Sequence, residues 1–203
     1  MNLRFLMFFF ILAVPLAARA ELDGFHVGNG QDGALTVTAP NTVVNSYTTL
    51  TAQVGLGGTQ LQVADATNFP PGALVMLLRT TGAAEPVAGN QDPVALGLVG
   101  RPELARVQSV NGNTLTLTAS VQNFTFVATT TQVIRVREYS SVTVNAGASL
   151  SAPAWNGLTG GVLAILVSGT LTSNGSLDVS GRGFRGGVAL VNSAGTTGCT
   201  GLE

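Results

Sequence analysis

Short runs of alternating apolar and polar residues, interrupted every few positions by Gly, Asn or Ser, fill residues 140–187. An alternation with a period of two is typical of β-strands, whereas a helix needs apolar residues about every 3.6 positions. Gly and Asn between such runs mark tight corners. The pattern therefore predicts short strands and no helix in this half of the chain, with the strands at residues 141–145, 161–167, 169–172, 176–179 and 188–191.

Many short strands joined by tight corners are typical of a parallel β-solenoid, in which each turn of the chain stacks its aliphatic side chains on the turn before. After Glu138 and Tyr139 charged residues become rare and Gly becomes dense, which marks the expected domain boundary. Residues 139–203 are thus predicted to begin a Gly-rich, solenoid-like unit that is incomplete at its C-terminal end. Because an open end exposes strand edges, we expect it to be continued, capped or used for self-association.

Residues 21–138 carry a different pattern, with roughly seven alternating strands joined mostly by short turns. The clearest feature is a hairpin within residues 103–118, where two alternating runs flank Asn-Gly-Asn at 111–113 and a positive φ is easily adopted. Residues 73–79 are nearly all apolar, which predicts a strand buried on both faces, and residues 80–101 predict a surface loop. The expected fold is all-β, with a small antiparallel barrel or sandwich before the solenoid-like unit.

Residues 1–20 have the features of a secretory signal peptide. Arg4 supplies the positive start, residues 5–14 form an unbroken apolar core, and Ala18-Arg19-Ala20 fits a small-x-small cleavage site. The apolar run is too short for a membrane span, which needs about 20 residues. We expect cleavage after residue 20, a secreted or cell-surface location, and no stable membrane span in the mature chain.

Charged residues make up only 9% of the chain, and all nine basic residues are arginines. A nearly neutral chain offers no cluster of cations for nucleic acid. Residues 181–186 match the Gly-x-Gly-x-x-Gly pattern of dinucleotide sites, but the chain continues as a strand where such a site needs a helix. His26 is the sole histidine and Cys199 the sole cysteine, so neither a zinc site nor an internal disulfide is predicted. We expect no cofactor and no metal.

The Gly-rich unit contains four candidate ligand contacts: Trp155, Asp178, Arg182 and Arg185. An exposed Trp can stack on a sugar ring, although a Trp that caps the end of a β core is the commoner arrangement. Asp178 with either arginine could bind a metal or an anion in a polysaccharide-degrading enzyme. Glycosidases, however, need two carboxylates across the scissile bond, and Asp178 is the only acid between Glu138 and Glu203. No catalytic residue is therefore assigned.

Several Gly-rich motifs recur along the chain: residues 24–30, 72–77, 111–117, 154–157 (Ala-Trp-Asn-Gly), 159–161 (Thr-Gly-Gly) and 180–187 (Ser-Gly-Arg-Gly-Phe-Arg-Gly-Gly). In these motifs the chain resembles large secreted Gly-rich surface proteins of gliding bacteria, of the adventurous-gliding-motility type. The resemblance implies an extracellular, β-rich surface protein with a link to motility. It brings no catalytic residues.

The favoured hypothesis is an exported, non-catalytic cell-surface or extracellular-matrix protein with a structural or adhesive role. A carbohydrate-binding module and a polysaccharide lyase or hydrolase of the β-solenoid type stay open as alternatives. The expected partners are cell-surface polysaccharide, other surface proteins, or a second copy that associates through the open C-terminal end. Nucleic acid is not expected as a partner.

Overall fold

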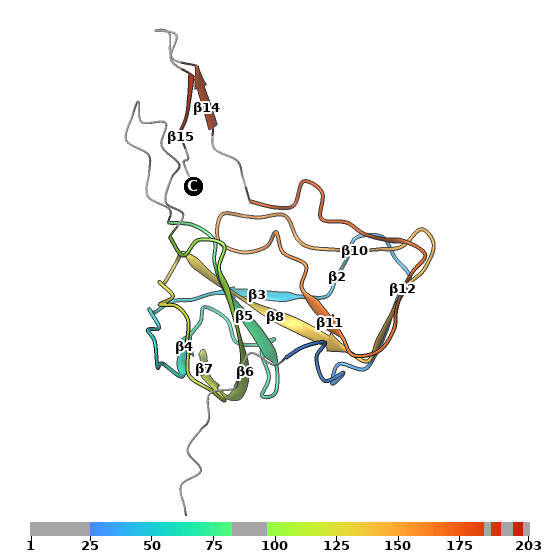
Figure 1. Ribbon diagram of the computed structural model, residues 1–203, viewed down its shortest axis with the longest axis horizontal. Helices are drawn as coiled ribbons and strands as arrows, with labels where there is room; N and C mark the ends of the chain where they lie inside the picture. The colour runs from blue at the N-terminus through green and yellow to red at the C-terminus, as the bar shows by residue number, and fades with distance from the viewer. Residues whose placement is uncertain (1–24, 83–96, 185–187, 192–196, 201–203) are drawn as a thin grey trace, which may run out of the picture.

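The computed structural model describes residues 25–82, 97–184, 188–191 and 197–200, the last two ranges by their backbone alone. These residues form strands, turns and loops without a helix, so the predicted all-β class is confirmed (Figure 1). The expected signal peptide, most of the loop at 80–101, and Arg185 lie outside the described residues. The strands are β1 Ala34–Val37, β2 Thr42–Val43, β3 Ser46–Thr49, β4 Gln60–Gln62, β5 Leu74–Arg79, β6 Pro102–Asn111, β7 Thr114–Leu117, β8 Thr131–Tyr139, β9 Ser141–Val144, β10 Ser149–Ser151, β11 Ile165–Val167, β12 Leu171–Ser173, β13 Ser176–Leu177, β14 Val188–Val191 and β15 Thr197–Thr200.

The largest sheet is mostly antiparallel and curls into a half-barrel. Its strand order is β11-β8-β5-β6-β7-β4, and β3 also pairs with β8. β5 lies between β6 and β8 and is buried on both faces, as its apolar sequence predicts. β6 and β7 form the predicted hairpin, which closes at Asn111 and Thr114 around Gly112 at φ 54°. The antiparallel unit expected from the sequence is therefore present as a half-barrel.

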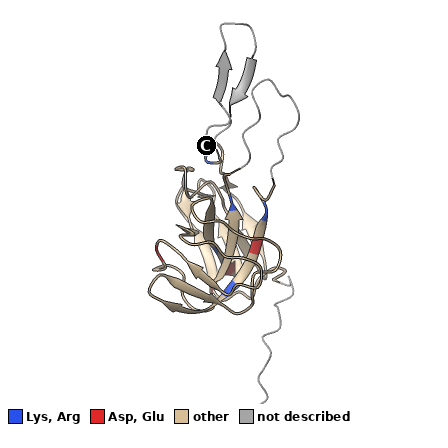
Figure 2. Ribbon diagram, turned by 90° about the vertical axis from the view of Figure 1, so that its left-hand side faces the viewer, with Lys and Arg blue, Asp and Glu red and all other residues tan. Residues whose placement is uncertain are grey.

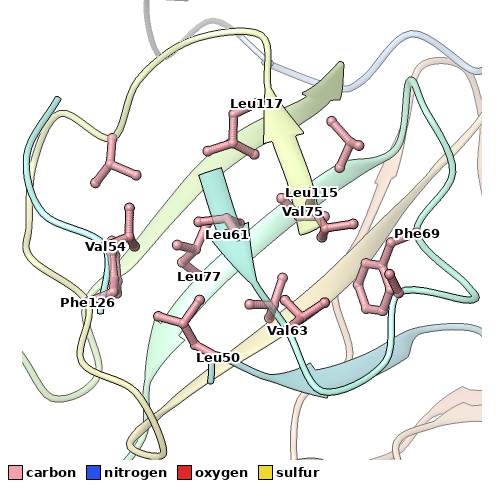
Figure 3. Packing of buried hydrophobic residues seen from close by; sticks show 14 of the residues in the cluster. Leu50, Val54, Leu61, Val63, Phe69, Val75, Leu77, Leu115, Leu117 and Phe126 are labelled. Atoms are coloured by element: carbon pink, nitrogen blue, oxygen red, sulfur yellow. The ribbon is translucent and has the colours of Figure 1, made fainter. Parts of the chain in front are cut away.

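The main hydrophobic core packs against this half-barrel. Figure 3 shows aliphatic side chains from β4, β5 and β7 meeting aromatic side chains from the connecting loops. Burial of each such side chain contributes about 1.5–3 kcal/mol, so this cluster is the main source of stability for the half-barrel. The residues labelled there are Leu50, Val54, Leu61, Val63, Phe69, Val75, Leu77, Leu115, Leu117 and Phe126.

Three parallel ladders join strands that are far apart in the sequence. Their orders are β1-β9-β12 and β2-β10-β13, with β8 paired to β11 as the third. Arg137 pairs with Ile165, Val142 with Leu171 and Ser149 with Ser176, which are separations of 28, 29 and 27 residues. A second core lines these ladders and contains Val37, Tyr139, Val142, Val144, Ala148 and Leu150.

β1 and β2 hydrogen-bond to strands beyond residue 139, although the sequence analysis placed them in the antiparallel unit. Ala34 pairs with Ser141, 107 residues later, and strands β3 to β8 of the half-barrel lie between them in the sequence. Parallel strands are not joined by a hairpin, so no local sequence pattern predicts this pairing. The chain thus enters the parallel ladders, leaves them to form the half-barrel, and returns to them.

The strand predicted at 161–167 begins only at Ile165, and before it two side-chain amides bond the backbone at Gly160 and Ala164 in place of a strand partner. Gln132, which is fully buried, donates from Nε2 to the Gly160 carbonyl (3.2 Å) and accepts from the Gly160 N–H at Oε1 (3.0 Å). Asn45 makes the same pair of bonds with Ala164, at 2.6 and 3.0 Å. Both amides therefore satisfy backbone groups that would otherwise be buried without partners.

Tyr47 adds a third link to this segment, and its ionisation is expected to lower the stability of the fold at high pH. Its hydroxyl donates to the Val162 carbonyl at 2.5 Å, and burial raises the pKa of Tyr47 to about 12. Between pH 10 and 12 the unfolded chain loses this proton while the folded chain keeps it, so the free energy of unfolding falls as pH rises. We expect a loss of about 1–2 kcal/mol over this range, discounted because the ring is only partly buried.

Urea unfolding of the wild type and Tyr47→Phe between pH 8 and 12 measures this effect. Burial also raises the pKa of Tyr139, so the variant should lose part of the slope and keep the rest. An unchanged slope in Tyr47→Phe would show that its hydroxyl does not titrate differently in the folded chain.

Candidate functional site

Three of the four predicted contact residues lie together where the chain leaves β13. The Trp155 N–H donates to the Arg182 carbonyl at 2.9 Å, and the Arg182 N–H donates to the Val179 carbonyl at 3.0 Å. Asp178 precedes this turn and lies close enough to Arg182 for an electrostatic interaction. We call Trp155, Asp178, Arg182 and Phe184 the corner surface; the fourth predicted contact, Arg185, lies outside the described residues.

Glycine makes the close approach at this corner possible. A Cβ on Gly161 would lie 3.1 Å from the Arg182 carbonyl oxygen, and one on Gly160 would lie 2.8 Å from that of Ala154. Both glycines also have positive φ, 103° at Gly160 and 73° at Gly161, which side chains rarely adopt. The Thr-Gly-Gly motif thus lets the loop that carries Trp155 pack against the chain at Arg182.

The exposed aromatic ring at the corner belongs to Phe184 and not to Trp155. Trp155 is only 6% exposed, and Phe184, at 45% exposed, meets it edge to face with 4.8 Å between ring centroids. Trp155 therefore packs as a buried residue beneath Phe184. The sequence analysis did not select Phe184, because Phe within a Gly-rich loop gives no sign of which ring will be uppermost.

Asp178 is exposed and ionised at neutral pH. Its carboxylate accepts a hydrogen bond from the Ser180 N–H at 2.8 Å. Hydrogen bonding to Ser180, with a smaller contribution from the charge of Arg182, lowers the pKa of Asp178. A carboxylate of this kind accepts hydrogen bonds from hydroxyl groups but is a poor proton donor at pH 7. Within the described residues, no group of three His, Cys, Asp or Glu side chains could hold a metal ion.

Most other charges in the described chain form a buried cluster that the sequence analysis missed. The fully buried Glu138 carboxylate accepts from Arg106 Nη1 at 2.8 Å and Nη2 at 3.1 Å, and from Gln31 Nε2 at 2.6 Å. Asp32 accepts from Arg135 at 3.1 Å and from Arg137 at 3.0 Å. Figure 2 shows how few positions on the described ribbon are charged.

This cluster is structural, because each of its two carboxylates accepts hydrogen bonds from two of its other members, although Arg135 Nε is buried without a hydrogen-bond partner. Its ionic residues come from β6, β8 and the N-terminal segment, so it ties the half-barrel to the start of the parallel ladders. The available signal was the concentration of charge in Arg-Val-Arg-Glu at 135–138, in a chain that has few charges elsewhere.

No protein-family model matches the chain, and no curated protein matches it. The tailspike of Acinetobacter baumannii bacteriophage AP22, solved with A. baumannii capsular saccharide, is 13% identical with a TM-score of 0.33 over 59% of this chain and 28% of its own. The tailspike of Pseudomonas phage LKA1 is 11% identical with a TM-score of 0.34, covering 60% and 27%. That of Pseudomonas phage phi297 is 18% identical with a TM-score of 0.35, covering 71% and 21%. The chain thus spans less than a third of each tailspike, and the likeness is too distant to bear on function.

Proposed function

We propose that this chain is an exported, non-catalytic cell-surface or extracellular-matrix protein with a structural or adhesive role, built on a parallel β-solenoid. The observation that carries the proposal is that three ladders each pair strands in parallel at a separation of 27–29 residues. In such a stack each turn contacts only its neighbours, and ladder hydrogen bonds with stacked aliphatics give stiffness without cofactors or charge.

The half-barrel fits this role as a module carried by the stack. Its strands β3 to β8 lie between β2 and β9 in the sequence, and both β2 and β9 belong to the parallel ladders. The ion pairs of Asp32 with Arg135 and Arg137, and the Gln132 and Asn45 amides, hold it against them. In a structural or adhesive role, these contacts would keep the half-barrel fixed on the stack under load.

The proposed location rests on the signal-peptide features of residues 1–20, and the proposed link to gliding motility on the Gly-rich motifs. In the part of the chain that the structure describes, no helix is long and apolar enough to cross a membrane. Expression of the whole chain in a Gram-negative host tests the proposal. We expect a mature chain that begins at Glu21, is recovered outside the cytoplasm, and adheres to immobilised bacterial cells. An uncleaved cytoplasmic chain, or a mature chain without adhesion, would contradict it.

The corner surface favours carbohydrate binding as a second function. Phe184 presents an exposed ring, while Asp178 offers an ionised acceptor and Arg182 a donor within the same turn. An aromatic face beside a few polar groups is a common arrangement in sugar sites. The substrate class would be a bacterial surface polysaccharide.

Replacement of Phe184 by Ala should weaken binding to a surface polysaccharide roughly 5- to 20-fold, because it removes the exposed ring. A glycan array followed by calorimetry on the best ligand measures the change. Leu56→Ala is the matched control, since Leu56 is also an exposed apolar residue, at 62% against 45% for Phe184, and lies far along the chain from the corner. Equal affinity in both variants would exclude the corner as the sugar site. Product assays on the same ligand, with Asp178→Ala, test the degrading-enzyme alternative.

A further inference from the structure

The last strand of each parallel ladder leaves an aliphatic surface uncovered. β11, β12 and β13, which we call the outer turn, each lie at the end of their strand order. Leu171 is 43% exposed, whereas its partner Val142 in the middle of the ladder is 1% exposed. Leu177 is 46% exposed, and its partner Leu150 is fully buried. Side chains of in-register partners point the same way, so the outer turn continues a buried column without a cover.

The residues that follow repeat the sequence that forms the outer turn. Residues 160–170 read Gly-Gly-Val-Leu-Ala-Ile-Leu-Val-Ser-Gly-Thr, and residues 186–196 read Gly-Gly-Val-Ala-Leu-Val-Asn-Ser-Ala-Gly-Thr. The shift between them is 26 residues, close to the spacing of the ladders. The first of these segments leads through β11 to β12. The identical pairs are Gly160 and Gly186, Gly161 and Gly187, Val162 and Val188, Gly169 and Gly195, and Thr170 and Thr196.

We propose that β14 and β15 form the next turn of the stack, with β15 added in parallel to β12 so that it covers Leu171; this rests on the proposed solenoid. In the same register, Leu171 would pair with Thr197 and Ser173 with Cys199. β14 and β15 pair antiparallel with each other in this structure. A two-stranded hairpin is marginally stable alone, whereas a parallel turn on the outer turn satisfies its edges and buries its aliphatics. We therefore expect the parallel turn to be more stable than the isolated hairpin.

Cysteine cross-linking tests the register, because Cys199 is the sole cysteine of the chain. Neighbouring parallel strands lie about 4.8 Å apart, which is within the Cα separation of a disulfide. Under mild oxidation Ser173→Cys should lose both free thiols and form an intrachain disulfide with Cys199. Thr172→Cys, whose side chain points to the opposite face of β12, should keep both thiols.

Two further variants separate the outcomes. In the hairpin Cys199 pairs with Ala189, so a disulfide in Ala189→Cys with none in Ser173→Cys would overturn the proposal. A Ser173→Cys disulfide between two chains would also overturn it, in favour of a second copy on the outer turn. The double variant Thr143→Cys with Thr172→Cys, in a Cys199→Ser background, tests whether β9 and β12 pair in the register of the structure. Its failure to link would refute the proposed solenoid itself, independently of the outer turn.

Discussion

Replacement of Glu138 by Ala is expected to lower the free energy of unfolding by about 3–5 kcal/mol, the usual effect of removing one partner of a buried ion pair. The carboxylate is fully buried and accepts two hydrogen bonds from Arg106, one from Gln31 and one from the Asn29 N–H. Its removal leaves these donors, including the partly exposed guanidinium of Arg106, facing a cavity. Because the domain has a stability of roughly 5–15 kcal/mol, the variant should be near the limit of folding at 37 °C.

Urea unfolding followed by circular dichroism measures this loss. Glu138→Gln keeps the shape of the side chain and should be less damaging than Glu138→Ala. Asp65→Asn is the control for loss of an acid, because Asp65 is an exposed loop residue whose carboxylate bonds only locally, to Thr67. A Glu138→Ala midpoint as close to wild type as that of Asp65→Asn would mean that the buried cluster does not hold the half-barrel to the ladders.

Replacement of Gly175 by Ala should destabilise the parallel ladders by about 3 kcal/mol, because an added methyl group has no room between two turns. A Cβ at this corner would overlap the carbonyl oxygens of Ala148 and Asn145 and lie 2.9 Å from Val144 Cγ1. Those carbonyl oxygens belong to the backbone of the turn below, and the Ala148 carbonyl accepts the Ser176 N–H at 3.2 Å. Relief of the overlap therefore requires breaking the contact between β10 and β13.

Gly183→Ala is the matched control, since Gly183 has neither a positive φ nor an atom near its Cβ position. Thermal unfolding should show a large decrease in Tm for Gly175→Ala and almost none for Gly183→Ala. If both variants have the same Tm as the wild type, the two turns do not approach each other as closely as the structure requires.

Local patterns predicted the elements whose partners are close in sequence. The alternation around residues 111–113 predicted the β6–β7 hairpin, and the apolar run at residues 73–79 predicted the buried β5, because strand period and turn chemistry are local properties. The pairing of β1 with β9 could not be predicted in the same way. A parallel partner 107 residues away depends on where the intervening half-barrel returns the chain.

That the corner residues contact a ligand stays a prediction, but their position at one corner follows in part from local patterns. The Gly-rich residues 180–187 pointed to a corner, and Trp155, Asp178 and Arg182 do lie together there. Which of two aromatic rings is uppermost depends on packing between two loops, and so the exposed Phe184 was not selected. The buried charge cluster was missed because Asp32 and Glu138 are far in the sequence from the arginines with which they form ion pairs.

The central claim is that strands β9 to β13 stack in parallel on β1, β2 and β8 and on one another. NMR of the isotope-labelled protein tests it most directly, through nuclear Overhauser contacts between backbone protons of neighbouring strands. We expect residues 142–144 to show contacts of the parallel type with residues 35–37 on one side and with residues 171–173 on the other. Antiparallel contacts at β9, or none with either neighbour, would contradict the stack.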